Sequence, residues 1–181
     1  MKIEVTSLPG VLLLTPAVYK DERGAFSETF NLREMAEAGI PTNWVQDNFS
    51  ISKKNVLRGI HYQIAQPQGK LVRVTHGAVL DVVVDLRSSS PEFGRHMAVE
   101  LSGENGRMLW IPEGFGHAFL VLSEEAGFAY KVTDYYAPKD ERTILWNDPD
   151  LAISWPIGGG DVIVSEKDRK GARLRDAEVF A

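Results

Sequence analysis

The stretch IPEGFGH, residues 111–117, places a tight turn between two segments that favour β-strands. It follows the pattern Pro-x-Gly-x-x-His from Pro112 to His117, with RMLW before it and AFLVLS after it. Proline and glycine are strong turn signals, and the aliphatic and aromatic residues on either side are typical of strands. The stretch therefore predicts a strand–turn–strand unit with His117 at the start of the second strand.

Most of the remaining chain shows the same alternation of strand-like segments and turns such as QPQG and SGENG. Many short strands at close spacing, with few helices, predict an all-β sandwich or small barrel. One helix is indicated at LREMAEAG, where Asn31 can act as the N-cap and Gly39 can end it. The predicted strands span residues 44–52, 55–63, 70–77, 78–87, 95–102, 107–114, 117–123 and 127–136.

The size and composition of the chain exclude several classes of protein. Its 181 residues fit a single domain, residues 1–181, with a short polar tail from about residue 157 that could hold one helical turn. A net charge of −5 gives no basic footprint for nucleic acid. The absence of cysteine excludes disulfides and thiolate ligands and fits a cytoplasmic protein. We expect no signal peptide, because the N-terminal apolar run is broken by Pro9, Gly10 and Pro16. We expect no membrane partner, because no apolar run approaches the length of a membrane-spanning helix.

The turn at residues 112–117 resembles the second half of the cupin signature, which implies a double-stranded β-helix, or jelly-roll, barrel. The first half of that signature presents His-x-His to a metal, but here the equivalent place reads His61-Tyr62-Gln63. A catalytic metal needs three or more well-placed nitrogen or oxygen ligands. His61 and His117 alone fall short, so we expect no metal and a histidine that acts as an acid or base.

Several stretches in the same order resemble the dTDP-4-dehydrorhamnose 3,5-epimerase family, from about Arg23 to Asp168. The resemblance implies an isomerase that inverts C3 and C5 of dTDP-4-dehydro-6-deoxy-D-glucose, giving dTDP-4-dehydro-L-rhamnose for dTDP-L-rhamnose biosynthesis. It also implies a homodimer without a cofactor. The stretches are DERGAFSETF, WVQDNFSISKKNVLRGIHYQ, QGKLVRVTHGAVLDVVVDLR, LWIPEGFGHAFLVLSE, AYKVTDYYAPKDERTILWNDPDLAISWP and SEKD.

Epimerisation beside a ketone needs a base, an acid across the ring and a cationic group at the enolate oxygen. By resemblance, His61 is the base, Tyr130 is the acid and Lys70 lies near the keto oxygen. A carboxylate usually orients a histidine base, and by resemblance this partner is Asp168. The sequence alone leaves Asp81, in a core strand, as a competing partner.

The resemblance also implies how the nucleotide is bound. Tyr136 stacks on thymine, and on a straight strand it would share a face with Tyr130 at about 20 Å. The expected diphosphate partners are Arg23, Arg58 and Lys167, and guanidinium and ammonium groups suit such an anion. Further substrate contacts are expected from Glu28, Gln46, Asp47, Asn48, His117 and Glu141.

Arg58 and His61 raise a geometric difficulty, because residues three apart on a regular strand point to opposite faces. A bulge at Gly59 would bring both side chains to one face. Alternatively, the two residues serve different sites across a subunit interface. The sequence leaves both alternatives open.

Other functions fit parts of the sequence. A related enzyme would epimerise only C3 or only C5 of a dTDP-4-keto sugar, or would isomerise the keto group. A metal-dependent cupin oxygenase is disfavoured by His61-Tyr62-Gln63, and a non-catalytic sugar-binding cupin would need no base. In plainer interpretations His61 is a core histidine, Lys70 is a solvated strand end, and the tyrosines line the core.

Overall fold

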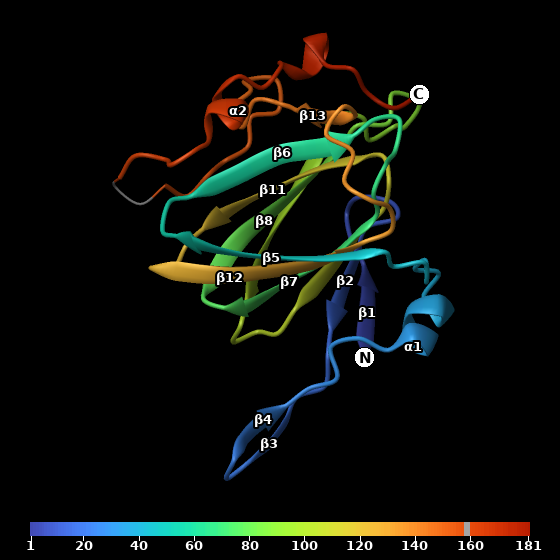
Figure 1. Cartoon of the computed structure of the whole chain (residues 1–181), viewed down its shortest axis with the longest axis vertical. Coiled ribbons are helices and arrows are strands. Elements are labelled where there is room, and N and C mark those ends of the chain that lie inside the picture. Colours follow the sequence, from blue (N-terminus) through green and yellow to red (C-terminus); the bar gives the residue numbers. More distant parts are fainter. Residues whose placement is uncertain (158–159) are drawn as a thin grey trace.

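Two antiparallel sheets pack face to face in the computed structural model of the chain, which describes residues 1–157 and 160–181 (Figure 1). The first sheet has the strand order β1-β2-β10-β7-β12-β5 and the second has the order β13-β6-β11-β8-β9. The first comprises β1 (Lys2–Val5), β2 (Leu12–Thr15), β5 (Gln46–Lys53), β7 (Lys70–His76), β10 (Met108–Ile111) and β12 (Glu125–Val132). The second comprises β6 (Leu57–Gln63), β8 (Ala78–Asp85), β9 (His96–Ser102), β11 (Phe115–Val121) and β13 (Glu141–Thr143).

Strand β8 shows why the sequence forms this sandwich. Val79 and Val83 are fully buried between the two sheets, whereas Val82 and Val84 are fully buried on the opposite face of their own sheet. Because successive side chains of a strand point to opposite faces, a strand covered on both sides reads as a nearly continuous apolar run. The prediction of an all-β, cupin-type barrel is confirmed.

Helix α1 (Leu32–Glu37) lies on the outer face of the six-stranded sheet. Its buried Met35 packs with Leu71 and Met108 from the sheet. The predicted N-cap is present, since the Asn31 side chain accepts hydrogen bonds from the backbone N–H groups of residues 33 and 34. Gly39, with φ of 74°, follows the helix end as predicted.

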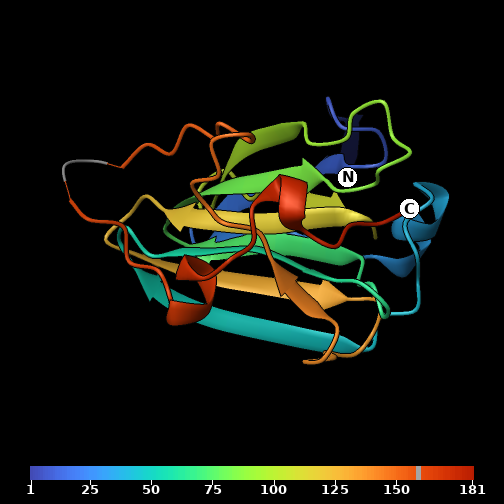
Figure 2. The ribbon, with the colours of Figure 1, turned by 90° about the horizontal axis from the view of Figure 1, so that it is seen from above.

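Residues 144–155 and 174–180 pack on the outer face of the five-stranded sheet (Figure 2). Ile144 and Leu151 are buried there, and Phe180 N–H donates to the carbonyl of Leu86. The predicted polar tail from about residue 157, of which residues 158–159 lie outside the described residues, therefore packs on the sheet at residues 174–180 and lines a cavity at residues 163–168. It holds the short helix α2 (Glu166–Arg169) and the 3₁₀ turn η1 (Leu174–Asp176).

The prediction of one strand over residues 127–136 is wrong, because β12 ends at Val132. The Asp134 carboxylate accepts hydrogen bonds from the Tyr135 backbone N–H at 2.7 Å and from the Gln66 side chain at 2.8 Å. These bonds stabilise a turn, so Tyr130 and Tyr136 do not share one straight strand. The predicted ranges also leave out β1, β2, β13 and a separate hairpin of β3 (Tyr19–Asp21) and β4 (Gly24–Phe26).

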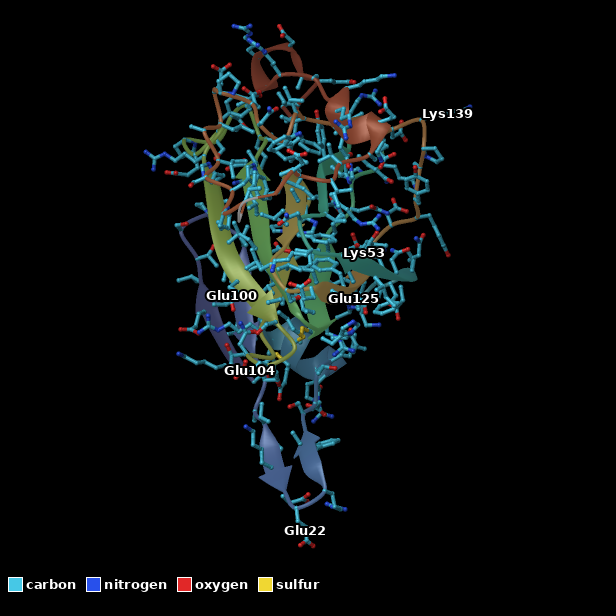
Figure 3. The ribbon with its side chains drawn as sticks, turned by 90° about the vertical axis from the view of Figure 1, so that its left-hand side faces the viewer. Glu22, Lys53, Glu100, Glu104, Glu125 and Lys139 are labelled. Carbon is cyan, nitrogen blue, oxygen red and sulfur yellow. The ribbon has the colours of Figure 1, made fainter. Side chains whose placement is uncertain are left out.

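The β3–β4 hairpin projects from the sandwich, with Glu22 at its tip (Figure 3). Tyr19 and Phe26 on the hairpin are 66% and 68% exposed, so two large apolar side chains lie in solvent in the single chain. Among the described residues, no helix is long and apolar enough to cross a membrane.

Candidate active site

A cavity of about 860 Å³ opens between the two sheets at one end of the sandwich. Strands β5, β6, β7, β11, β12 and β13 form its walls, and the segment at residues 163–168 closes one side. It brings together ten of the fourteen predicted site residues. These are Asn48, Arg58, His61, Lys70, His117, Tyr130, Tyr136, Glu141, Lys167 and Asp168.

A β-bulge explains how Arg58 and His61 both line this cavity within one chain. His61 lies opposite His117 and Arg58 lies opposite Phe119, so three steps along β6 match two steps along β11. Gly59 takes a φ of 123°, and a Cβ atom there would lie 2.5 Å from the His117 carbonyl oxygen. Only glycine fits this close approach without a shift of backbone.

His61 forms a close contact with a buried carboxylate. Its Nε2 lies 2.5 Å from Oδ1 of Asp168, a residue that is only 2% exposed. Burial raises the pKa of the Asp168 carboxyl, but the hydrogen bond from His61 and the charge of His61 outweigh this, so the pKa lies below its usual value. Because an ionised carboxylate only accepts hydrogen bonds, Nε2 carries the proton. Nδ1 of His61 is then the nitrogen that can take a proton.

Asp81, the competing partner for His61, lies beside a different histidine. Its Oδ2 is 2.9 Å from Nε2 of His117, and Asp81 is fully buried. The His117 ring stacks on Phe128 at a centroid distance of 5.8 Å. The structure thus places Asp168, and not Asp81, beside His61.

Lys70 is buried at the first residue of β7, which contradicts the interpretation as a solvated strand end. Within the described part of the chain its Nζ makes one long hydrogen bond, 3.5 Å to the carbonyl oxygen of His61. Burial lowers the pKa of Lys70 to about 8, although the carboxylates of Glu141 and Asp81 act in the opposite direction. An ammonium group with so few partners can bind an oxygen of a ligand.

Tyr130 lies on β12, in the sheet opposite the one that carries His61. Burial raises the pKa of the Tyr130 phenol, and the charge of Glu141 adds to this while Arg58 opposes it. The phenol therefore keeps its proton at neutral pH and can donate it.

Glu141 organises the rim of the cavity. Its carboxylate accepts hydrogen bonds from the Tyr136 hydroxyl at 2.9 Å and from Lys167 Nζ at 2.7 Å. Burial raises the pKa of Glu141, but the hydrogen bonds from Lys167 and Tyr136 bring it below its usual value. Tyr136 is 52% exposed, so one aromatic face is available to a flat ligand.

Four predicted site residues lie outside the cavity lining. Arg23 is on the projecting hairpin, where its Nη2 pairs with Asp21 at 2.6 Å. Glu28 accepts a hydrogen bond from Asn31 before α1, and Asp47 pairs with Lys131. Gln46 accepts a hydrogen bond from the Tyr136 backbone and donates one to Asn48, so it supports the rim.

The residue-based predictions missed the apolar part of the cavity wall. Phe119 and Phe128 line it, with their rings stacked at 4.2 Å. Strand alternation could have predicted both residues, because side chains two positions apart on a strand share a face. Phe119 is two residues from His117, and Phe128 is two residues from Tyr130. No group of three or more histidine, aspartate and glutamate side chains within residues 1–157 and 160–181 could hold a metal ion.

A cupin-type barrel with two histidine–aspartate pairs, a buried lysine and a protonated tyrosine in one cavity has the groups of an acid–base enzyme. The family model described as dTDP-4-dehydrorhamnose 3,5-epimerase matches residues 5–176. The chain belongs to this family of isomerases.

Individual relatives agree with this assignment. The chain is 53% identical over 181 residues to dTDP-4-dehydrorhamnose 3,5-epimerase of Pseudomonas aeruginosa, with 99% of each chain covered. It is 50% identical to the enzyme of the same name from Shigella flexneri, again with 99% of each covered. The crystal structure of dTDP-6-deoxy-D-glucose-3,5-epimerase from Legionella pneumophila, in complex with dTDP-4-keto-L-rhamnose, superimposes with a TM-score of 0.95. That protein is 50% identical, and the match covers 98% of this chain and 94% of the other.

Proposed function

We propose that this chain converts dTDP-4-dehydro-6-deoxy-D-glucose to dTDP-4-dehydro-L-rhamnose by inverting C3 and C5, as a step of dTDP-L-rhamnose biosynthesis. The observation that carries the proposal is the placement of a base and an acid on opposite walls. His61, held by buried Asp168, is on one sheet, and Tyr130 is on the other. A sugar ring between them would present one face to each group.

The proposed proton transfers use His61, Lys70 and Tyr130 of one chain together with protons from solvent. His61 Nδ1 removes a proton from a carbon beside the ketone, and the electron pair moves onto the keto oxygen as an enolate. The Lys70 ammonium stabilises this negative charge, and its burial strengthens the interaction because the site excludes water. The electron pair then returns from the oxygen to the carbon as Tyr130 donates its proton to the opposite face. His61 releases the abstracted proton to solvent and the Tyr130 phenolate takes a proton from solvent, so the same steps can follow at the second carbon.

The nucleotide part of the substrate is assigned to the rim. Arg58 and Lys167 would bind the diphosphate, and thymine would stack on the exposed face of Tyr136. Asn48 and Glu141, which also line the cavity, would offer hydrogen bonds to the ligand. The reacting sugar would then lie deeper, between His61 and Tyr130.

Incubation of the protein with dTDP-4-dehydro-6-deoxy-D-glucose in D₂O tests this function. We expect deuterium at both C3 and C5 of the product, because each inverted carbon receives a solvent-derived proton. Mass spectrometry and NMR of the product measure the number and position of the labels. Label at one carbon only would identify a mono-epimerase, and no label would identify a binding protein.

The position of Arg23 supports a homodimer with shared active sites. Arg23 adjoins Glu22 at the tip of a hairpin that projects from its own chain (Figure 3), and it does not line its own cavity. The exposed Tyr19 and Phe26 on the same hairpin would be buried against a second copy. We therefore assign Arg23 to the diphosphate site of the partner subunit.

Subunit mixing tests this assignment. Arg23→Ala should lower kcat/KM by about 10–100-fold, as expected for loss of a charge-assisted hydrogen bond. The Arg23→Ala chain is then refolded with an equal amount of the inactive His61→Asn chain. Half of the dimers should be hybrids, and each hybrid has one complete site, with His61 from one chain and Arg23 from the other. The mixture should therefore show about one quarter of wild-type activity. Lys20→Ala, on the same hairpin, is the control and should stay active. If mixing restores nothing, Arg23 does not act across the interface.

A further inference from the structure

A second histidine–aspartate pair lies at the cavity wall and has no role in the proposed reaction: His117 lines the cavity, and Asp81 contacts it from behind. His117 Nε2 lies 2.9 Å from Asp81 Oδ2, and the two residues are 9% and 0% exposed. The other oxygen of Asp81, Oδ1, is buried without a hydrogen-bond partner in the described part of the chain. A carboxylate with an unsatisfied buried oxygen is costly for stability, so its retention here needs a reason.

The second pair has the same arrangement as the first. In both pairs Nε2 faces the carboxylate, and His117 lies directly opposite His61 in the pairing of β11 with β6. An ionised carboxylate at this position would accept from Nε2 and leave Nδ1 for a ligand. Nδ1 of His117 has no hydrogen-bond partner among residues 1–157 and 160–181, and His117 lines the cavity.

Asp81 also acts on Lys70 through its charge. Burial lowers the pKa of Lys70 to about 8, and the negative charges of Glu141 and Asp81 limit that decrease. Asp81 lies on β8 at the inner side of the cavity wall, whereas Glu141 lies at the rim and is already bound to Tyr136 and Lys167. The titratable and charged groups that share this cavity region with Lys70 are Arg58, His61, Tyr62, Asp81, His117, Tyr130, Tyr136, Glu141, Lys167 and Asp168.

We propose that Asp81 is a positioning residue, which holds His117 with Nδ1 toward the substrate and keeps Lys70 as an ammonium ion at the enolate oxygen. The inference rests on the proposed function. Asp81 touches no substrate atom and acts only through His117 and Lys70. Its negative charge favours the ammonium form of Lys70 in the interior of the barrel, where burial alone would favour loss of the proton.

Asp81→Asn tests this role because it removes the charge but keeps the shape. We expect kcat and kcat/KM to fall together by about 10²-fold, as for loss of one group that stabilises the transition state. The alkaline limb of the pH–rate profile, near pH 8 in the wild type, should move to lower pH. Loss of the negative charge of Asp81 makes the protonated form of Lys70 less favourable, so the pKa of Lys70 should fall and the alkaline limb should follow it. The Tyr130 phenol, with its raised pKa, titrates above this limb.

Asp85→Asn is the matched control. Asp85 is a second fully buried aspartate of β8, but its carboxylate pairs with Arg87 and Ser90 and not with a histidine of the cavity wall. It should lower the melting temperature and leave the alkaline limb in place. If both variants keep the wild-type limb, Asp81 has only a structural role. If the wild type itself fails to epimerise the substrate, the proposed function fails instead.

The wild-type protein offers a test that does not depend on folding of a variant. The chain has four histidines, so long-range ¹H–¹⁵N spectra of the labelled protein resolve the tautomer of each. At neutral pH His117 should carry a proton on Nε2. A His117 protonated on Nδ1 alone would show that it does not donate to Asp81 and would overturn the inference.

Discussion

Replacing His61 with asparagine is expected to abolish epimerisation and also deuterium exchange at the carbons beside the ketone. Asparagine has a similar shape but cannot accept a proton at neutral pH, so no enolate forms. General base catalysis contributes about 10²–10⁴-fold, and both rates should fall by at least this factor. Binding of dTDP, measured by calorimetry, should persist because Arg58, Tyr136 and Lys167 are unchanged.

His76→Asn is the control for this variant. His76 is the last residue of β7, is largely exposed, and does not line the cavity. Its replacement should leave both rates unchanged. Exchange at the wild-type rate in His61→Asn would show that another group is the base, and His117, directly opposite on β11, would be the first candidate.

Replacing Tyr130 with phenylalanine is expected to separate exchange from inversion. The substitution removes only the phenol oxygen, and the ring can still pack beside Phe128. His61 can therefore still abstract the proton, and the enolate can be reprotonated from its original face. Net inversion should fall by about 10²–10⁴-fold, the usual contribution of a general acid, while exchange of the substrate proton continues. Parallel measurement of solvent label in recovered substrate and of product formed gives both rates.

Tyr135→Phe is the matched control, because it removes the same oxygen from a tyrosine that is 61% exposed and outside the cavity lining. It should have no effect on either rate. If Tyr130→Phe stops exchange entirely while His61→Asn retains it, the two roles are reversed. The tyrosine would then act as a phenolate base and the imidazole as the acid.

The fold follows from local signals that agree with one another. The turn at Pro112–His117 and the strand-like runs around it predict a β-sandwich, and the structure places β10 and β11 on either side of this turn. The end of β12 could not be predicted, because the turn at Asp134 depends on a hydrogen bond from the distant Gln66. Strand propensity alone continues through Tyr135 and Tyr136.

The arrangement of the site residues was harder to predict from the sequence than the fold, because it depends on contacts between residues that are distant in the chain. No spacing rule pairs His61 with Asp168, which is 107 positions away, and only the family resemblance selected it over Asp81. Gly59 indicated that a bulge was possible. That the bulge forms and turns Arg58 and His61 to the same face depends on the register of β6 with β11, which the sequence does not determine. The distance of Arg23 from its own cavity depends on the direction of a hairpin, and the sequence carries no signal for that.

The long separation between His61 and Asp168 has a consequence for biosynthesis of the enzyme. A ribosome adds about 5–20 residues per second, so about 5–20 s pass between synthesis of the histidine and of its carboxylate. During that interval the strands of the barrel can begin to pair, but the nascent chain lacks the group that orients its base. Catalytic competence should therefore appear late and abruptly, when α2 emerges and docks, and a growing chain would not act on its substrate.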